Sequence, residues 1–195
     1  MTEQGTAFDA ACASVLRGSG ASEDAKAEGV YTVECYLEDG TLRWKDTIDN
    51  VVTNVGKNLL LDSGLGANVT VVGPYMGLIS SIGYTGVPVV GDTMSSHGTW
   101  VEAGSSTNYP LYTAPRKTCV WASASGGSKA LSAALSFSII TTGGTVKGCF
   151  IVTGTGALST IADTNGVLYS AGVFTGGDKV VGVGDTLQVS YSTSL

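Results

Sequence analysis

His97 is the single histidine of the chain, within the segment Ser95-Ser96-His97-Gly98-Thr99-Trp100. A Ser/His/Asp or Cys/His hydrolase would need it as the general base that takes a proton from the nucleophile. The sequence has no G-x-S-x-G turn, the motif that presents a nucleophilic serine at the end of a strand. We therefore interpret His97 as a loop histidine with a structural hydrogen bond, and we expect the chain not to be an enzyme.

Metal and phosphate sites find little support in the residue spacing. Asp163-Thr164-Asn165-Gly166 begins like a calcium loop but lacks the later Glu, and a plain Asx turn fits the same residues. In Gly154-Thr155-Gly156-Ala157-Leu158-Ser159, a serine occupies the last glycine position of the dinucleotide-binding motif. The sequence therefore predicts no metal and no other cofactor.

The four cysteines lack the paired spacing that holds zinc or forms a dense disulfide framework. They are Cys12, Cys35, Cys119 and Cys149. Cys35 and Cys149 stand in strand-like runs, where a reduced thiol packs as a small apolar group. We interpret the cysteines as structural thiols in a reducing compartment.

Aromatic side chains and one basic pair supply the remaining candidates for contact with a partner. Trp100, Tyr109, Tyr112 and Trp121 would serve either as a sugar-stacking platform or, as is commoner in a β-sandwich, as core or interface anchors. Arg116-Lys117 is the densest basic group of the second half of the chain. We favour the core or interface interpretation for the aromatic residues.

The elements that must position these residues are mostly strands. Apolar and polar residues alternate from Val30 to Leu37, Asp39-Gly40 supplies a tight turn, and residues 41–45 form the returning strand of a hairpin. Thr53 to Asp62 combines a capping residue with an apolar face, which predicts a short helix. The echoed segments Val90-Gly91-Asp92-Thr93 and Val183-Gly184-Asp185-Thr186 predict turns in which Asp or Thr bonds nearby backbone.

The rest of the chain consists of short strand-like runs separated by glycine-containing turns. These runs predict an all-β fold, an antiparallel β-sandwich or jelly-roll-like domain over residues 30–195. The runs are 69–72, 75–82, 99–102, 119–124, 131–140, 146–153, 167–173, 179–183 and 186–192.

Residues 1–29 differ from this domain and form a separate N-terminal arm. Phe8, Ala11, Cys12, Val15 and Leu16 recur at helical spacing, and Gly18 stands at a C-cap position. The predicted helix, residues 7–17, is too short to be stable alone and needs a surface for its apolar face. Residues 18–29 read as a linker, so the arm is either a docking segment or an unfolded tail.

Charge is scarce and unevenly placed. Residues 1–62 carry 11 acidic and 5 basic side chains, whereas residues 63–195 carry 5 of each. So few charges indicate a surface that is either covered by Ser, Thr and Gly or buried against other subunits. A net charge of −6 and the lack of a basic cluster argue against nucleic acid as a partner. No apolar run of membrane-spanning length and no secretory signal is evident, so we expect no membrane partner and a protein that stays where it is made or leaves by another route.

Several segments, in this order, resemble small β-rich proteins encoded among the structural genes of tailed bacteriophages. The similarity spans about residues 30–195 and is closest to the head decoration, or capsid cement, proteins. The segments that carry it are residues 50–62, 75–79, 91–94, 100–102, 168–172 and 184–187.

The resemblance implies a virion structural protein, made in the host bacterial cytoplasm and located on the capsid surface. Such a protein binds the outside of an icosahedral capsid, cements neighbouring major capsid proteins and forms a homodimer or homotrimer. A tail-associated module, or one that binds a receptor or sugar, is the alternative. The residues we expect at capsid or oligomer contacts are Phe8, Val15, Leu16, Trp100, Tyr109, Tyr112, Arg116, Lys117 and Trp121.

Overall fold

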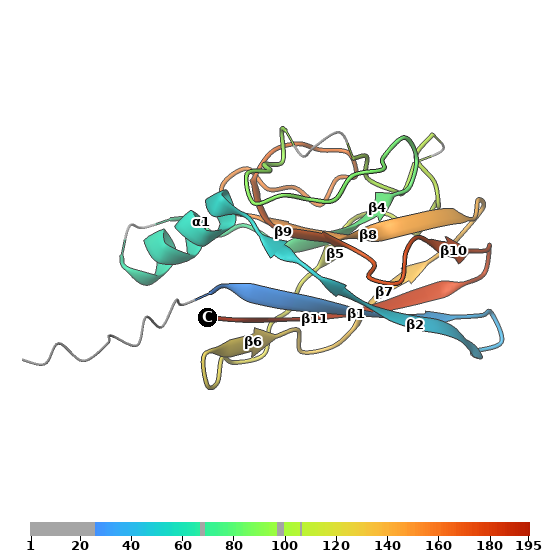
Figure 1. Ribbon diagram of the computed structural model, residues 1–195, viewed down its shortest axis with the longest axis horizontal. Coiled ribbons are helices and arrows are strands. Elements are labelled where there is room, and N and C mark those ends of the chain that lie inside the picture. The colour runs from blue at the N-terminus through green and yellow to red at the C-terminus, as the bar shows by residue number, and fades with distance from the viewer. Residues whose placement is uncertain (1–25, 67–68, 97–99, 106) are drawn as a thin grey trace, which may run out of the picture.

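The structure is a computed structural model that describes residues 26–195 with the exception of 67–68, 97–99 and 106. Two antiparallel sheets lie face to face (Figure 1). The predicted all-β antiparallel sandwich is confirmed, and a jelly-roll-like arrangement stays a prediction.

Sheet A has the strand order β2-β1-β11-β6, and β7 also pairs with β11. Its strands are β1 (Glu28–Tyr36), β2 (Leu42–Asp49), β6 (Ser128–Ala130), β7 (Leu135–Ser138) and β11 (Thr186–Ser194). Sheet B has the order β3-β9-β8-β4-β5, and β10 also pairs with β8. Its strands are β3 (Val51–Val52), β4 (Tyr75–Ser80), β5 (Lys117–Thr118), β8 (Gly144–Thr153), β9 (Val167–Val173) and β10 (Lys179–Val181).

Sheet A has one face in the core and one face in solvent. Tyr31, Val33 and Cys35 of β1 are buried, whereas the residues between them are partly exposed. This is the period-two pattern of a half-buried antiparallel strand. The predicted hairpin is confirmed: β1 pairs with β2, and Gly40 takes a φ of 83° in the turn between them.

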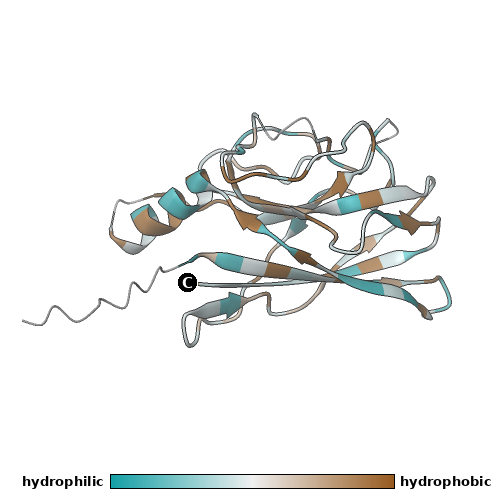
Figure 2. Ribbon diagram, viewed as in Figure 1, coloured by the Kyte–Doolittle hydropathy of each residue, from teal (hydrophilic) through white to brown (hydrophobic). Residues whose placement is uncertain are grey.

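Sheet B is covered on both faces. Its inner face packs on sheet A, and its outer face is covered by the described residues of the loop segments 81–116 and 154–166, drawn above it in Figure 1. Tyr84, Met94 and Trp100 from the first loop segment join the cluster on that outer face. Strands β4, β8 and β9 are consequently rich in hydrophobic residues along much of their length, as the colouring of Figure 2 indicates.

The predicted strands differ in how well they match. Val167–Val173 is a strand with the expected bounds, whereas residues 69–72 form none. Glu102 makes one isolated bridge, with Ile79 of β4. The segment from 100 to 102 belongs to the loop layer, where the backbone pairs with the sheet at single positions instead of along a ladder.

Helix α1 (Asn54–Gly64) confirms the helix predicted after Thr53. The Thr53 hydroxyl accepts a hydrogen bond from the Gly56 N–H at 3.1 Å and donates one to the Leu168 carbonyl of β9. The cap therefore also ties the helix to sheet B. Figure 1 shows α1 at one end of the sandwich, the end at which β1 begins.

Candidate interaction surfaces

A hydrophobic groove lies beneath helix α1. Its first cavity has a volume of about 260 Å³ and is lined mainly by apolar side chains from α1, the segment before β4, Trp121 and sheet B. A second cavity, of about 270 Å³, shares Leu60 with the first and is lined by Ala27, Lys57, Leu60, Leu61 and Leu195. We call the two together the α1 groove.

The sequence of α1 explains why the groove stays open. Leu59, Leu60 and Leu61 are consecutive, so their side chains point in three directions around the helix. One packed face cannot bury all three, and Leu61 is 59% exposed. Helix α1 therefore presents apolar surface beyond the part that contacts the sandwich.

A second apolar surface lies at the opposite end of the sandwich, which we call the distal rim. The turns before β2, β8 and β11 meet there (Figure 1). Its side chains are exposed and hydrophobic: Leu37, Leu42, Tyr109, Ile140, Val180 and Val183.

Backbone contacts hold the loops of the distal rim together. The Gly184 N–H donates to the Ile139 carbonyl at 3.0 Å, and a Cβ on Gly184 would lie 3.2 Å from the Glu38 carboxylate. A Cβ on Gly144 would come within 2.5 Å of the Tyr109 ring, so that ring lies directly on the backbone where β8 begins. The rim is thus a packed edge made of several loops.

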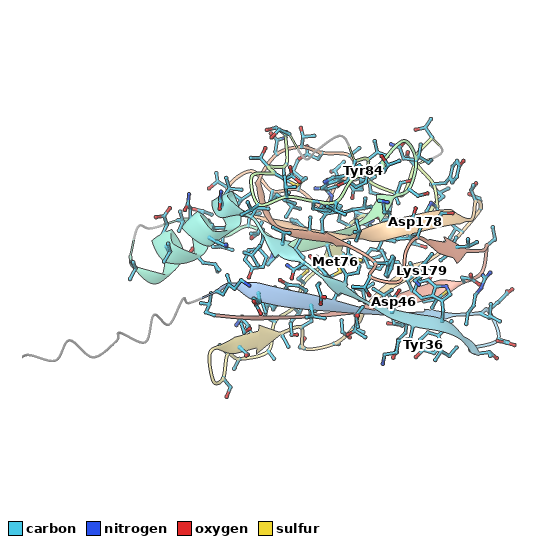
Figure 3. All side chains as sticks on the ribbon, viewed as in Figure 1. Tyr36, Asp46, Met76, Tyr84, Asp178 and Lys179 are labelled. Atoms are coloured by element: carbon cyan, nitrogen blue, oxygen red, sulfur yellow. The ribbon has the colours of Figure 1, made fainter. Side chains whose placement is uncertain are left out.

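Two ion pairs link β2 to the C-terminal part of the chain. Arg43 contacts Asp185 at 2.6 Å. Lys179 contacts Asp46, in the middle of β2, at 2.6 Å (Figure 3). Burial raises the pKa of Asp46, but hydrogen bonds from Lys179, Thr47 and Thr175 outweigh this and hold it below its usual value. These pairs neutralise charge between the sheets, and the exposed charged side chains of the rim's β1–β2 turn are Glu38 and Asp39, beside the exposed hydrophobic ones.

Three of the expected contact residues are buried, which corrects their assignment to a surface. Trp100 and Tyr112 are each 1% exposed, and Arg116 is 2% exposed. Trp100 packs against Phe150 with ring centroids 4.9 Å apart, and Tyr112 packs edge-on against Phe137 at 5.1 Å. Trp100 joins the cluster under the loop layer on sheet B, whereas Tyr112 belongs to the core between the two sheets, so the four aromatic residues form no common exposed platform.

Arg116 forms a buried ion pair with Glu102. Its guanidinium donates to both Glu102 oxygens, at 2.9 and 2.7 Å, and also to the carbonyls of Leu158 and Asp163. Burial raises the pKa of Glu102, and the hydrogen bonds from Arg116 act in the opposite direction. The pair joins the two loop segments that cover sheet B, so its role is structural.

Lys117, Trp121 and Tyr109 remain on or near the surface. Partial burial lowers the pKa of Lys117, whose Nζ donates to the Thr113 carbonyl at 2.6 Å. Trp121 is partly buried and lines the α1 groove, where it packs edge-on against Tyr191. Tyr109 belongs to the distal rim, so the structure places Trp121 and Tyr109 at opposite ends of the sandwich.

The other expected contact residues, Phe8, Val15 and Leu16, lie outside the described residues, as do His97 and Cys12. The three described cysteines have free, buried thiols. Burial raises the pKa of Cys35 and of Cys119 to about 12, and it raises that of Cys149 further. These thiols stay protonated near neutral pH and pack as apolar groups.

The turn interpretations also agree with the structure. The Asn165 N–H donates to Asp163 Oδ1 at 2.9 Å, which is an Asx turn. Asp92 and Asp185 each accept from the backbone N–H three residues earlier, Val89 and Gly182. Across the described ranges, no three or more His, Cys, Asp or Glu side chains gather in a way that would hold a metal ion.

Sequence reasoning missed both apolar surfaces as sites. The run Leu59-Leu60-Leu61 was the available signal for the α1 groove, since three consecutive leucines cannot share one helix face. The distal rim had no local signal, because its residues come from loops that are far apart in the sequence.

Comparisons with models of protein families, with curated proteins and with solved structures each gave no match. In the part of the chain that the structure describes, no helix has the length and apolar character needed to cross a membrane.

Proposed function

We propose that this chain is a virion structural protein that binds the outside of an icosahedral phage capsid and cements neighbouring major capsid proteins. The sequence resemblance to phage decoration proteins suggests the class. The distal rim is the observation that carries the proposal, because it supplies an apolar surface for attachment at the end of a stiff sandwich.

The polarity of the remaining surface supports an adhesive role. The solvent face of sheet A is mostly neutral and polar, with Gln188 bonded to Ser136 and Thr186 bonded to Ser138. Charged groups are largely used in ion pairs within the fold, such as Lys147 with Asp178. Buried contacts between subunits favour such charge-poor surfaces, and capsid symmetry multiplies a modest contact over many copies.

The first test is the number of copies of this chain in purified, density-banded virus particles, measured by quantitative mass spectrometry against the major capsid protein. A capsid cement protein is expected in a simple ratio to the capsid subunits. A handful of copies would reassign the chain to the tail, and its absence from particles would overturn the proposal.

A pair of matched variants tests the distal rim. Val183→Asp places a charge on the rim, and Val120→Asp places one at the opposite end on a side chain of similar exposure, 62% and 61%. We expect the Val183 variant to lose binding to undecorated capsids in a co-sedimentation assay, because burying an unpaired carboxylate is costly. The Val120 variant should bind normally, and equal binding by both variants would contradict attachment through the rim.

A further inference from the structure

The α1 groove lies beside the point where the N-terminal arm joins the sandwich. Ala27 lines its second cavity, and β1 begins at the next residue. The carboxyl-terminal residue Leu195 lines the same cavity. The chain that precedes residue 26 therefore joins the sandwich directly beside the groove.

The sequence of that preceding chain has the pattern that an apolar groove accepts. Phe8, Ala11, Cys12, Val15 and Leu16 repeat at i, i+3, i+4, i+7 and i+8, which places them on one face of a helix. Seven residues of helix rise about 10 Å, so Phe8 and Val15 lie about two turns apart on the same face.

Charge favours the same pairing. Residues 1–25 contain four acidic side chains, Glu3, Asp9, Glu23 and Asp24, and one basic side chain, Arg17. The walls of the two cavities include Lys129 and Lys57 and no acidic residue. Residues 7–17 themselves are neutral, with Asp9 and Arg17, so it is the acidic chain on either side of them, Glu3, Glu23 and Asp24, that complements the basic margin of the groove.

The connecting chain has sufficient length. Residues 18–25 span at most about 26–29 Å when extended. The groove begins next to Ala27, so this linker allows residues 7–17 to fold back onto their own sandwich. A short tether also gives the segment an effective concentration of about millimolar at its own groove.

We propose that residues 7–17 of this chain dock as a helix in the α1 groove of the same chain, with Phe8, Val15 and Leu16 against its apolar wall. The arm then completes the end of the sandwich opposite the distal rim. This inference is independent of what the distal rim binds.

Point variants in the full chain test the docking. Val15→Asp changes the proposed contact face, and Ser14→Asp makes the same change on the neighbouring polar face. We expect Val15→Asp to lower the urea midpoint to that of the chain lacking residues 1–25, and Ser14→Asp to leave it unchanged. Equal midpoints for all four proteins would overturn the proposal.

The fluorescence of Trp121 gives a second, local readout, because this side chain lines the groove. The emission of Trp121 is obtained by subtracting, from the spectrum of each protein, the spectrum of the same protein carrying Trp121→Phe. Val15→Asp should shift that emission to longer wavelength as the indole becomes hydrated. An unchanged Trp121 spectrum together with an unchanged midpoint would show that the groove is not the arm's site.

Disulfide trapping distinguishes the chain's own arm from that of a second copy. Ser63→Cys places a thiol in the groove, and Ser136→Cys places one on the solvent face of sheet A as the matched control. On mild oxidation we expect the Ser63 variant to form a bond to Cys12 within one chain, seen on a non-reducing gel as a monomer band that migrates faster than its reduced form. The Ser136 variant should show no such shift. Covalent dimers specific to the Ser63 variant would instead show arm exchange between copies and overturn the intramolecular assignment.

Discussion

Arg116 uses its side chain to hold two loops in place. It donates to Glu102 in one loop segment and to the carbonyls of Leu158 and Asp163 in the other. Its guanidinium also lies 5.2 Å from the ring centroid of Phe150 in sheet B. Glu102 adds a further bond by accepting from the Ala162 N–H at 2.7 Å. Each member of the pair is thus satisfied by several partners, which is the condition for burying charge.

Glu102→Gln tests this network at the residue scale. The substitution keeps the shape of the side chain but leaves the Arg116 charge buried without a counter-charge. Removing one partner of a buried ion pair typically costs about 3 kcal/mol or more, so we expect a loss of that size in the free energy of unfolding. Urea denaturation followed by tryptophan fluorescence measures it.

Glu34→Gln is the matched control, because Glu34 pairs with Lys45 on the solvent face of sheet A. Exposed pairs contribute little to stability, so this variant should be much less destabilised than Glu102→Gln. Similar losses in the two variants would contradict a structural role for the buried pair.

At the scale of elements, helix α1 is positioned by close contact with β9. Gly56 is the buried residue of the helix, and a Cβ there would come within 2.6 Å of the Tyr169 carbonyl oxygen. The Thr53 cap bonds the same strand through the Leu168 carbonyl. A glycine inside a helix usually weakens it. Here the close packing of α1 on β9 offsets the low helix propensity of Gly56.

Gly56→Ala should therefore destabilise the protein, although alanine is the better helix former. In an open helix the change would stabilise by about 1 kcal/mol. Here the backbone of β9 blocks the methyl group, and overpacking of this kind costs about 1–3 kcal/mol. Thermal or urea unfolding monitored by circular dichroism measures the difference.

Gly64→Ala provides the comparison within the same helix. Nothing lies within 4 Å of a Cβ at that position. We expect this variant to match or slightly exceed the stability of the original protein. A Gly56→Ala protein that was equally stable would mean that α1 can move away from β9 at little cost.

At the scale of the whole molecule, the sandwich has two apolar ends with different neighbours. The α1 groove lies where the arm enters, and the distal rim lies where the turns before β2, β8 and β11 meet (Figure 1). Between them, sheet A presents a neutral polar face and sheet B is covered by loops. The ends, rather than the faces, are therefore the surfaces suited to apolar contact with a partner.

Attachment through the distal rim should depend weakly on salt. Its contact area comes from exposed hydrophobic side chains, Arg43 and Asp185 are already paired with each other, and Glu38 and Asp39 are the exposed charges beside them. Salt screens unpaired surface charges far more than apolar contacts. We expect the affinity for undecorated capsids to change by less than about threefold between 50 and 500 mM NaCl, because apolar burial is not screened. A tenfold loss would indicate an electrostatic attachment instead.

Local sequence determined the elements of this protein. The alternation from Val30 to Leu37, the Asp39-Gly40 turn and the Thr53 cap each act within a few residues, so β1, β2 and α1 could be predicted from short segments. The two turns formed around Asp92 and Asp185 could be predicted for the same reason.

Tertiary structure decided which side chains face solvent and which loops meet. Trp100 and Tyr112 were expected at contacts, but Trp100 is buried under the loop layer and Tyr112 in the core between the sheets. The alternation within a strand does not reveal what covers its outer face. Glu102 and Arg116 are 14 residues apart in one loop segment and meet only because that segment folds back on itself over sheet B. The two apolar ends likewise combine residues from distant segments, and burial depends on such non-local contacts, which no short stretch of sequence encodes.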